Sequence, residues 1–90
     1  MIVLVINCGS SSLKYQLFNM ETRTHMAEGL ADRVAVGGGG QAVLTHRPAG
    51  RDPVVSEHPM PDHATAMGYV LDALVHPEHG VLSSLSDISA

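Results

Sequence analysis

Residues 7–14 are the part of this chain best suited to chemistry. Their sequence, NCGSSSLK, places one glycine, three consecutive serines and a lysine between two apolar runs. A turn of this composition exposes backbone N–H groups and hydroxyl donors, and Lys14 adds a positive charge, so the segment could bind phosphate. Asn7 offers a neutral oxygen of the kind that Mg²⁺ accepts beside its water ligands. The structural alternative is a serine-rich turn with an exposed lysine.

The spacing differs from that of a Walker A loop. Such a loop has a second glycine directly before its lysine, a Ser or Thr after it, and a helix that follows. Here Leu13 precedes Lys14, and the residues beyond alternate as in a strand. We therefore expect Lys14 to lie on a strand beside the turn.

Three strands are predicted to hold this turn. Residues 1–6 are uniformly apolar, which is typical of a strand buried on both faces and therefore central in its sheet. Residues 13–17 alternate between apolar and polar side chains, as a strand with one buried face does. Residues 22–30 could return as a third strand, so residues 1–30 are expected to form an antiparallel meander.

A glycine tract and a second hairpin are predicted over residues 37–58. Four consecutive glycines at 37–40 form the clearest flexible break in the chain. The β-prone runs 41–47 and 53–58 flank a turn that contains proline and glycine, which indicates a hairpin at a sheet edge. This region is interpreted as an insertion.

One helix is predicted over residues 62–76. Pro59 and Pro61 exclude a helix before Asp62, whose carboxylate can cap the next turn. Apolar side chains then recur at three- and four-residue steps, and Pro77 ends the pattern. The apolar stripe is interpreted as core, or as a face that packs on further parts of a larger protein.

The composition limits the partners and the location of the protein. Of its 90 residues, 44% are hydrophobic, 16% charged and 3% aromatic, a low charged fraction that indicates an incomplete domain. The net charge of −4 and the lack of a basic stripe argue against nucleic acid as a partner. No apolar run is long enough to cross a membrane, and the single cysteine suits a reducing cytoplasm.

Several conspicuous residues receive structural interpretations. His58 with His63, and His76 with His79, invite a metal site, but a proline interrupts the second pair and roles in loops and helix ends are favoured. Cys8 is expected to be a small buried thiol behind the turn, since no partner histidine makes it a nucleophile. The Asp62 carboxylate is expected to cap the helix, because no second carboxylate is paired with it.

Three segments resemble one protein family. The string NCGSSSLKY after a VLVI strand closely resembles the start of acetate kinases and of the similar propionate kinases, in the actin-like ATPase and sugar-kinase superfamily. Residues 29–34 (GLADRV) are similar to the family's G-L-x-x-R-[IV] stretch, and residues 62–71 (DHATAMGYVL) resemble its DH…A…VL…L helix. Butyrate kinases typically carry proline where Cys8 stands, so the resemblance favours the acetate and propionate branch.

The resemblance implies a fold and a site. The fold would be α/β, the N-terminal part of an actin-like ATPase (ribonuclease H-like) lobe that binds nucleotide, with an antiparallel β-meander, an inserted hairpin and a helix. Asn7 would help to hold Mg²⁺. Lys14, Ser10 and Ser12 would contact the phosphates of ATP. No catalytic residue is expected within this chain, because the family's catalytic and acetate-binding residues lie further along chains several times longer.

The resemblance also implies a reaction. A full-length protein of this kind would transfer the γ-phosphoryl group of ATP to acetate, giving ADP and acetyl phosphate, reversibly and as a cytoplasmic homodimer. The isolated 90 residues are expected to be inactive. Two alternatives stay open: a propionate kinase of the same family, and a non-catalytic interaction module.

Overall fold

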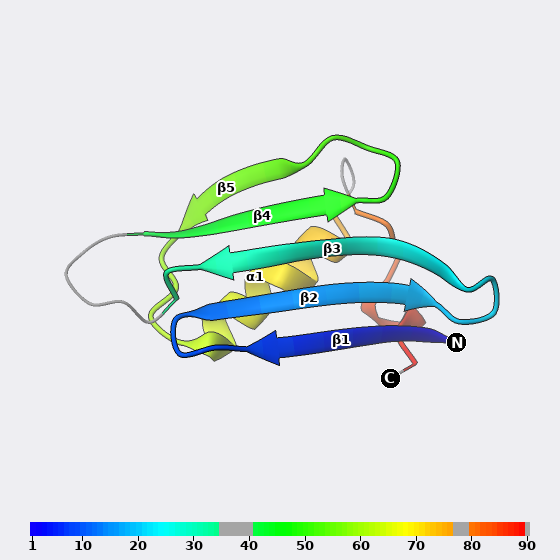
Figure 1. Ribbon diagram of the computed structural model, residues 1–90, viewed down its shortest axis with the longest axis horizontal. Coiled ribbons are helices and arrows are strands. Elements are labelled where there is room, and N and C mark those ends of the chain that lie inside the picture. The colour runs from blue at the N-terminus through cyan, green and yellow to red at the C-terminus, as the bar shows by residue number, and fades with distance from the viewer. Residues whose placement is uncertain (35–40, 77–79, 90) are drawn as a thin grey trace.

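The computed structural model describes residues 1–34, 41–76 and 80–89, which form one sheet and one α-helix (Figure 1). The elements in chain order are β1 (Ile2–Cys8), β2 (Ser12–Asn19), β3 (Thr24–Asp32), β4 (Ala42–Pro48), β5 (Val54–His58), α1 (His63–Leu74) and a short 3₁₀-helix (Leu85–Asp87). The strands lie in the order β1-β2-β3-β4-β5, and every neighbouring pair is antiparallel. The predicted meander and second hairpin are therefore both present, in a single sheet.

Helix α1 covers one face of the sheet and leaves the other face open (Figure 1). The alternation of β2 decides which side chains face the helix. Leu13, Tyr15 and Leu17 are buried on that side, while Lys14 and Gln16 are exposed on the open face. The core between sheet and helix consists of apolar side chains from both layers, led by Leu13, Tyr15, Leu17, Ala27, Ala31, Val34, Leu44, Ala66, Val70 and Leu74.

Strand β1 was predicted to be central and buried on both faces, and this prediction is wrong for the described chain. β1 is an edge strand, with β2 as its neighbour in the sheet. Its residues Ile2, Leu4 and Ile6 pack on the core, but Val5 on the open face is 39% exposed. A fully apolar sequence predicts a strand with both faces buried, but it does not identify the helix or strand that packs against each face.

Helix α1 begins where the sequence predicted. The backbone N–H of Thr65 donates to the Asp62 carboxylate at 2.7 Å, so Asp62 is the N-cap. The hydrogen bond from the Thr65 backbone, followed by that from its side chain, lowers the pKa of Asp62. The helix ends at Leu74 with Val75 as its C-cap, two residues before the predicted end.

The second hairpin is tied to β2 through the core. Gly29 of β3 pairs with Tyr15 on one side and His46 on the other. The Tyr15 side chain crosses Gly29, and its hydroxyl lies 2.6 Å from Nδ1 of the buried His46. A Cβ at position 29 would collide with the Tyr15 ring and with the Thr45 carbonyl oxygen, so only glycine fits there. Burial raises the pKa of the Tyr15 hydroxyl.

The segment after α1 returns to the start of the sheet. Leu82 is buried, and the N–H of Ser89 donates to the carbonyl of Ile2 at 2.8 Å. The two termini therefore lie near each other at one end of β1 (Figure 1). The predicted glycine break at 37–40 and the residue Pro77 lie outside the described residues. No helix among the described residues is long and apolar enough to span a membrane.

Candidate phosphate-binding site

The turn between β1 and β2 carries the candidate site. The N–H of Gly9 donates to the Ser12 carbonyl at 2.9 Å and closes the turn, leaving Ser10 and Ser11 exposed at its tip. A Cβ at Gly9 would lie 2.8 Å from the Ser12 hydroxyl oxygen, so a larger residue there would require the Ser12 side chain to rotate. Ser12 is half-buried at the first position of β2.

The three segments that resemble the kinase family meet at this turn. Val34, at the end of the GLADRV segment, donates its N–H to the Ser11 carbonyl at 2.8 Å. His63, the first residue of α1, places Nε2 at 2.9 Å from the Gly9 carbonyl oxygen. A carbonyl oxygen can only accept, so Nε2 of His63 carries the proton and donates. Segments far apart in the sequence thus fix the backbone of one turn.

The tip of the turn keeps free donors. In the part of the chain that the structure describes, no acceptor takes the backbone N–H of Ser10 or of Ser11. The hydroxyl groups of the same residues are exposed beside these amides. Clustered backbone amides and hydroxyls of this kind form a concave site that suits an anion.

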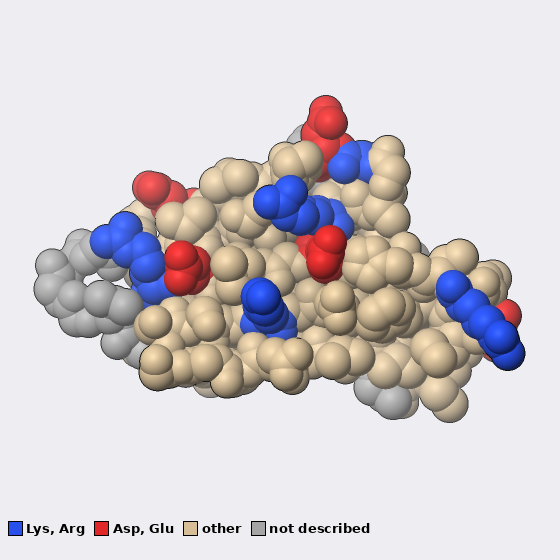
Figure 2. All heavy atoms as spheres, viewed as in Figure 1, with Lys and Arg blue, Asp and Glu red and all other residues tan. Residues whose placement is uncertain are grey.

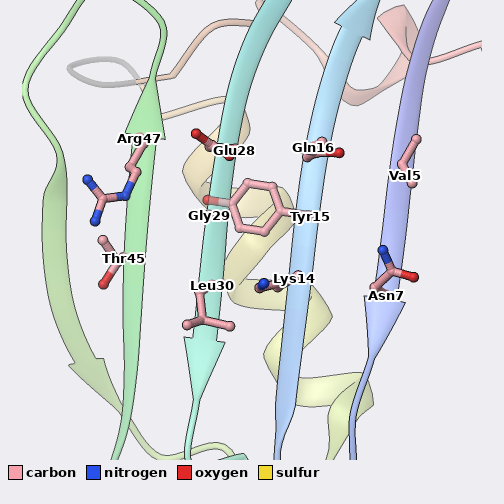
Figure 3. Close-up of a pocket in the computed structure, with 10 residues that line it drawn as sticks. All are labelled: Val5, Asn7, Lys14, Tyr15, Gln16, Glu28, Gly29, Leu30, Thr45 and Arg47. Atoms are coloured by element: carbon pink, nitrogen blue, oxygen red, sulfur yellow. The ribbon is translucent and has the colours of Figure 1, made fainter.

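Asn7 and Lys14 form a directly opposed pair next to the turn. The register of β1 and β2 places Asn7 opposite Lys14, and both are exposed on the open face of the sheet. Opposed residues of antiparallel strands have their Cβ atoms about 4.5–5.5 Å apart. Figure 3 shows both side chains at the same level of the sheet, at the rim of a hollow in its open face. The sequence predicted both residues as ligands, and the structure brings them together.

The open-face hollow has a volume of about 450 Å³. It is lined by Val5, Asn7, Lys14, Tyr15, Gln16, Glu28, Gly29, Leu30, Thr45 and Arg47. Ser10 and Ser12 are not among these residues and lie in the adjoining turn. Figure 2 shows this face, with basic and acidic side chains scattered over its middle and uncharged residues between them. The predicted site residues are therefore divided between the turn and the rim of the hollow.

Three polar residues of the hollow were missed by sequence reasoning. Gln16 and Arg47 both pair with Glu28, one on each side of β3, so all three share the open face. Their alternation along β2, β3 and β4 could have placed them on one face, but only once the order and register of the strands were known. None of them lies in a segment whose composition alone indicates a site.

The remaining sequence candidates have other surroundings. His58 stacks on Tyr69 with ring centroids 4.2 Å apart, and its Nε2 lies 2.9 Å from the Ser56 hydroxyl. Among the described residues, which do not include His79, no group of three His, Cys, Asp or Glu side chains could hold a metal ion. The expectation that Cys8 is buried is wrong, because it is the last residue of an edge strand and is exposed.

The donor set fits Mg²⁺ only as a partial protein site. The Asn7 carboxamide supplies one neutral oxygen on the open face. Mg²⁺ keeps several waters and usually takes one or two protein oxygens together with substrate phosphates. Since Lys14 stands opposite and repels a bare cation, an ion here would have to arrive with an anion. That combination describes a metal–phosphate complex.

The chain is similar in sequence to known acetate kinases. An acetate kinase from Desulfitobacterium hafniense (strain DSM 10664 / DCB-2) is 52% identical over 88 residues, which are 98% of this chain and 21% of that protein. An acetate kinase from Moorella thermoacetica is 49% identical over 88 residues, again 98% of this chain and 21% of that protein. The chain therefore spans about a fifth of the length of these relatives.

Solved structures show the same fold. The crystal structure of Porphyromonas gingivalis acetate kinase matches with a TM-score of 0.89 and 34% identity, over 99% of this chain and 22% of that one. A propionate kinase from Francisella tularensis matches with a TM-score of 0.70 and 27% identity, over 87% of this chain and 19% of that one. The five-stranded sheet with its helix is thus part of the fold of these kinases, and an incomplete domain.

The family model agrees with both comparisons. It describes the acetokinase family and matches residues 2–90, which is nearly the whole chain. The match includes the turn between β1 and β2, the GLADRV segment and the start of α1, the three places that meet in the structure. This chain belongs to the acetokinase family.

Proposed function

We propose that this chain provides the ATP-phosphate site of an acetate kinase. The observation that carries the proposal is the opposed pair Asn7 and Lys14 beside a turn with unpaired amides at Ser10 and Ser11. The Lys14 ammonium would neutralise phosphate charge. Ser10 and Ser12 would donate hydrogen bonds to phosphate oxygens.

Mg²⁺ would be held by Asn7 together with phosphate oxygens and water. When bound, the ion supplies positive charge that offsets the charge on the transferred phosphoryl group. The protein's share is to position the phosphates, because phosphoryl transfer needs little covalent chemistry from the enzyme. The open-face hollow next to Asn7 and Lys14 leaves room for such a complex.

The complete protein would transfer the γ-phosphoryl group of ATP to acetate and form acetyl phosphate. The names of the relatives support acetate as the acceptor, while the propionate kinase among the structural neighbours supports propionate as the second candidate. We further propose that residues 1–90 are the N-terminal part of the nucleotide-binding lobe, and that the complete enzyme is a cytoplasmic homodimer. No catalytic residue is assigned to this chain.

A chimeric kinase tests this proposal. Residues of this chain would replace the 88 matched residues in the Moorella thermoacetica acetate kinase, and acetyl phosphate formation would be measured. We expect an active chimera, no turnover by the 90 residues alone, and a loss of kcat/KM of about 10- to 100-fold for Lys14→Met, since a hydrogen bond to a charged group is worth about 1.5–3 kcal/mol. Arg23→Met, in the turn at the opposite end of β2, is the matched control that also removes one positive charge.

The outcomes separate the alternatives. A Lys14→Met chimera as active as its parent would contradict the assigned site. Turnover by the isolated chain at the rate of the chimera would contradict the view that it holds only the phosphate side. Relative kcat/KM values for acetate and propionate decide the acceptor only in the natural full-length enzyme, because the acyl pocket of the chimera comes from the other protein.

A further inference from the structure

We propose that His63 positions the phosphate-binding turn by holding the carbonyl of Gly9, and so directs the N–H of Ser10 toward the bound phosphate. The inference rests on the proposed function, since it concerns the same site. It assigns a role to a residue that lies 54 positions from the turn and does not line the open-face hollow.

The geometry of the peptide bond carries the first step. In a planar trans peptide the C=O of one residue and the N–H of the next point in opposite directions. The chain contains no cis peptide bond among the described residues, so the Gly9–Ser10 peptide is trans. Since its carbonyl is held by Nε2 of His63 at 2.9 Å, its N–H points away from the start of α1.

A second contact acts in the same way one residue further on. The Ser11 carbonyl accepts the N–H of Val34 at 2.8 Å, which turns the N–H of Ser12 away from Val34. The two contacts therefore fix the backbone on both sides of the turn tip, and the His63 contact sets the orientation of the Ser10 amide. Without them, an exposed turn with one glycine could rotate these peptides, and binding would have to fix them at an entropic cost.

The helix start explains why a histidine suits this task. Asp62 uses its carboxylate to cap α1 by accepting from Thr65, which fixes the backbone from which His63 projects. The imidazole ring reaches the turn and is half-buried. Nε2 donates both in this neutral tautomer and in the protonated ring, so the contact does not depend on the charge of His63.

A purely structural role is the competing explanation. The His63 contact could simply dock α1 against the sheet, in which case its loss would lower stability and leave phosphate binding by the folded protein unchanged. A positioning role predicts instead that binding is lost in molecules that are still folded. The two explanations differ in a property of the Ser10 amide, which can be observed directly.

The test uses ¹⁵N-labelled 90-residue chain and Mg·ATP as the probe, followed by NMR. In the unchanged chain we expect the amide of Ser10 to shift on titration, and His63 to show the Nε2–H tautomer. His63→Leu removes the donor and should weaken Mg·ATP binding about tenfold, with a smaller shift at Ser10. His63→Gln, whose amide nitrogen can still donate, should bind within about threefold of the unchanged chain.

Two further variants keep the outcomes distinct. His25→Leu, on β3 at the end of the sheet away from this turn, is the matched control and should bind as the unchanged chain does. Lys14→Met tests the candidate site itself. If neither Lys14→Met nor His63→Leu alters Mg·ATP binding, the proposed function fails, and the role of His63 fails with it.

The inference alone is overturned in two cases. If Lys14→Met abolishes binding while His63→Leu binds as tightly as the unchanged chain, His63 does not position the turn. If His63→Leu does not fold, the decision rests on the tautomer of His63 in the unchanged chain and on Mg·ATP binding by His63→Gln. An Nδ1–H tautomer at His63, or a Gln variant that is folded but binds as weakly as Lys14→Met, would contradict the proposed contact.

Discussion

Strands β1 and β2 are neighbours in one sheet, yet their sequences follow opposite patterns. Along β2, buried residues facing α1 alternate with exposed Lys14 and Gln16. Along β1, apolar side chains occupy both faces as far as Ile6, and Val5 lies exposed opposite Gln16. Only at the end of β1 do both strands carry polar side chains on the open face. These are the opposed residues Asn7 and Lys14 of the candidate site.

The difference shows how much of each strand's environment lies within this chain. β2 has a strand on either side and a helix over its apolar face, so its alternation is fully explained by the described structure. β1 has no second neighbouring strand among the described residues, where only Ser89 bonds to its outer edge at Ile2, and Val5 is partly exposed; the chain spans about a fifth of its relatives' length. We propose that further parts of the complete enzyme cover β1.

The largest expected effect is a loss of stability on the helix-facing side of β2. Leu17 is completely buried, and Leu17→Ala should lower the free energy of unfolding by about 3 kcal/mol, because it leaves a cavity. Val5→Ala on β1 should cost less than about 1 kcal/mol in the same chain, since Val5 is partly in water already. Urea unfolding measures both, and equal losses would remove the contrast between the strands.

A somewhat smaller effect is expected where the Tyr15 side chain of β2 crosses β3. Gly29→Ala places a methyl group against the Tyr15 ring and the Thr45 carbonyl, and should cost about 1–3 kcal/mol through overpacking. Gly68→Ala, at an open position on α1, is the matched control and should not destabilise the chain. A Gly29→Ala protein as stable as the parent would show that the Tyr15 side chain can pack without the space that glycine leaves at position 29.

The smallest effect concerns the buried Tyr15 of β2 in alkaline solution. Burial raises the pKa of Tyr15, whereas the unfolded chain would titrate it at its usual value near 10. Stability should therefore be unchanged below pH about 10 and fall as the pH rises above it, because the unfolded state then loses a proton that the folded state keeps. Ultraviolet titration should show that Tyr15 does not ionise near pH 10 in the folded chain, and its ionisation there without unfolding would contradict the burial of Tyr15.

Local patterns predicted most of the fold. The alternation of residues 13–17 gave the correct orientation of β2, and Asp62 marked the start of α1 because a cap acts within one turn. The position of β1 was wrong, since the identity of a covering layer is not a local property. The second hairpin was predicted, but its continuity with the meander depends on the pairing of β3 with β4.

The candidate site was predictable in part for the same reason. The composition of residues 7–14 indicated phosphate, and the hairpin register then placed Asn7 opposite Lys14. The contact of His63 with Gly9 joins residues 54 positions apart, and neither the metal-site interpretation of that histidine nor its place in the family-like segment 62–71 indicated a contact with the turn. Arg47 and Glu28 share a surface with Lys14 only because of the strand order.

The hydrogen bond between Tyr15 and His46 has a consequence for how this family can vary. It joins the first hairpin (β1 and β2) to the second (β4 and β5) across Gly29. The second hairpin therefore contributes a buried residue to the core and cannot be exchanged without affecting Tyr15. A relative that shortened β4 or replaced His46 would leave a phenol hydroxyl buried without its partner, unless position 15 changed as well. Positions 15, 29 and 46 should therefore evolve as one unit, changing together or not at all.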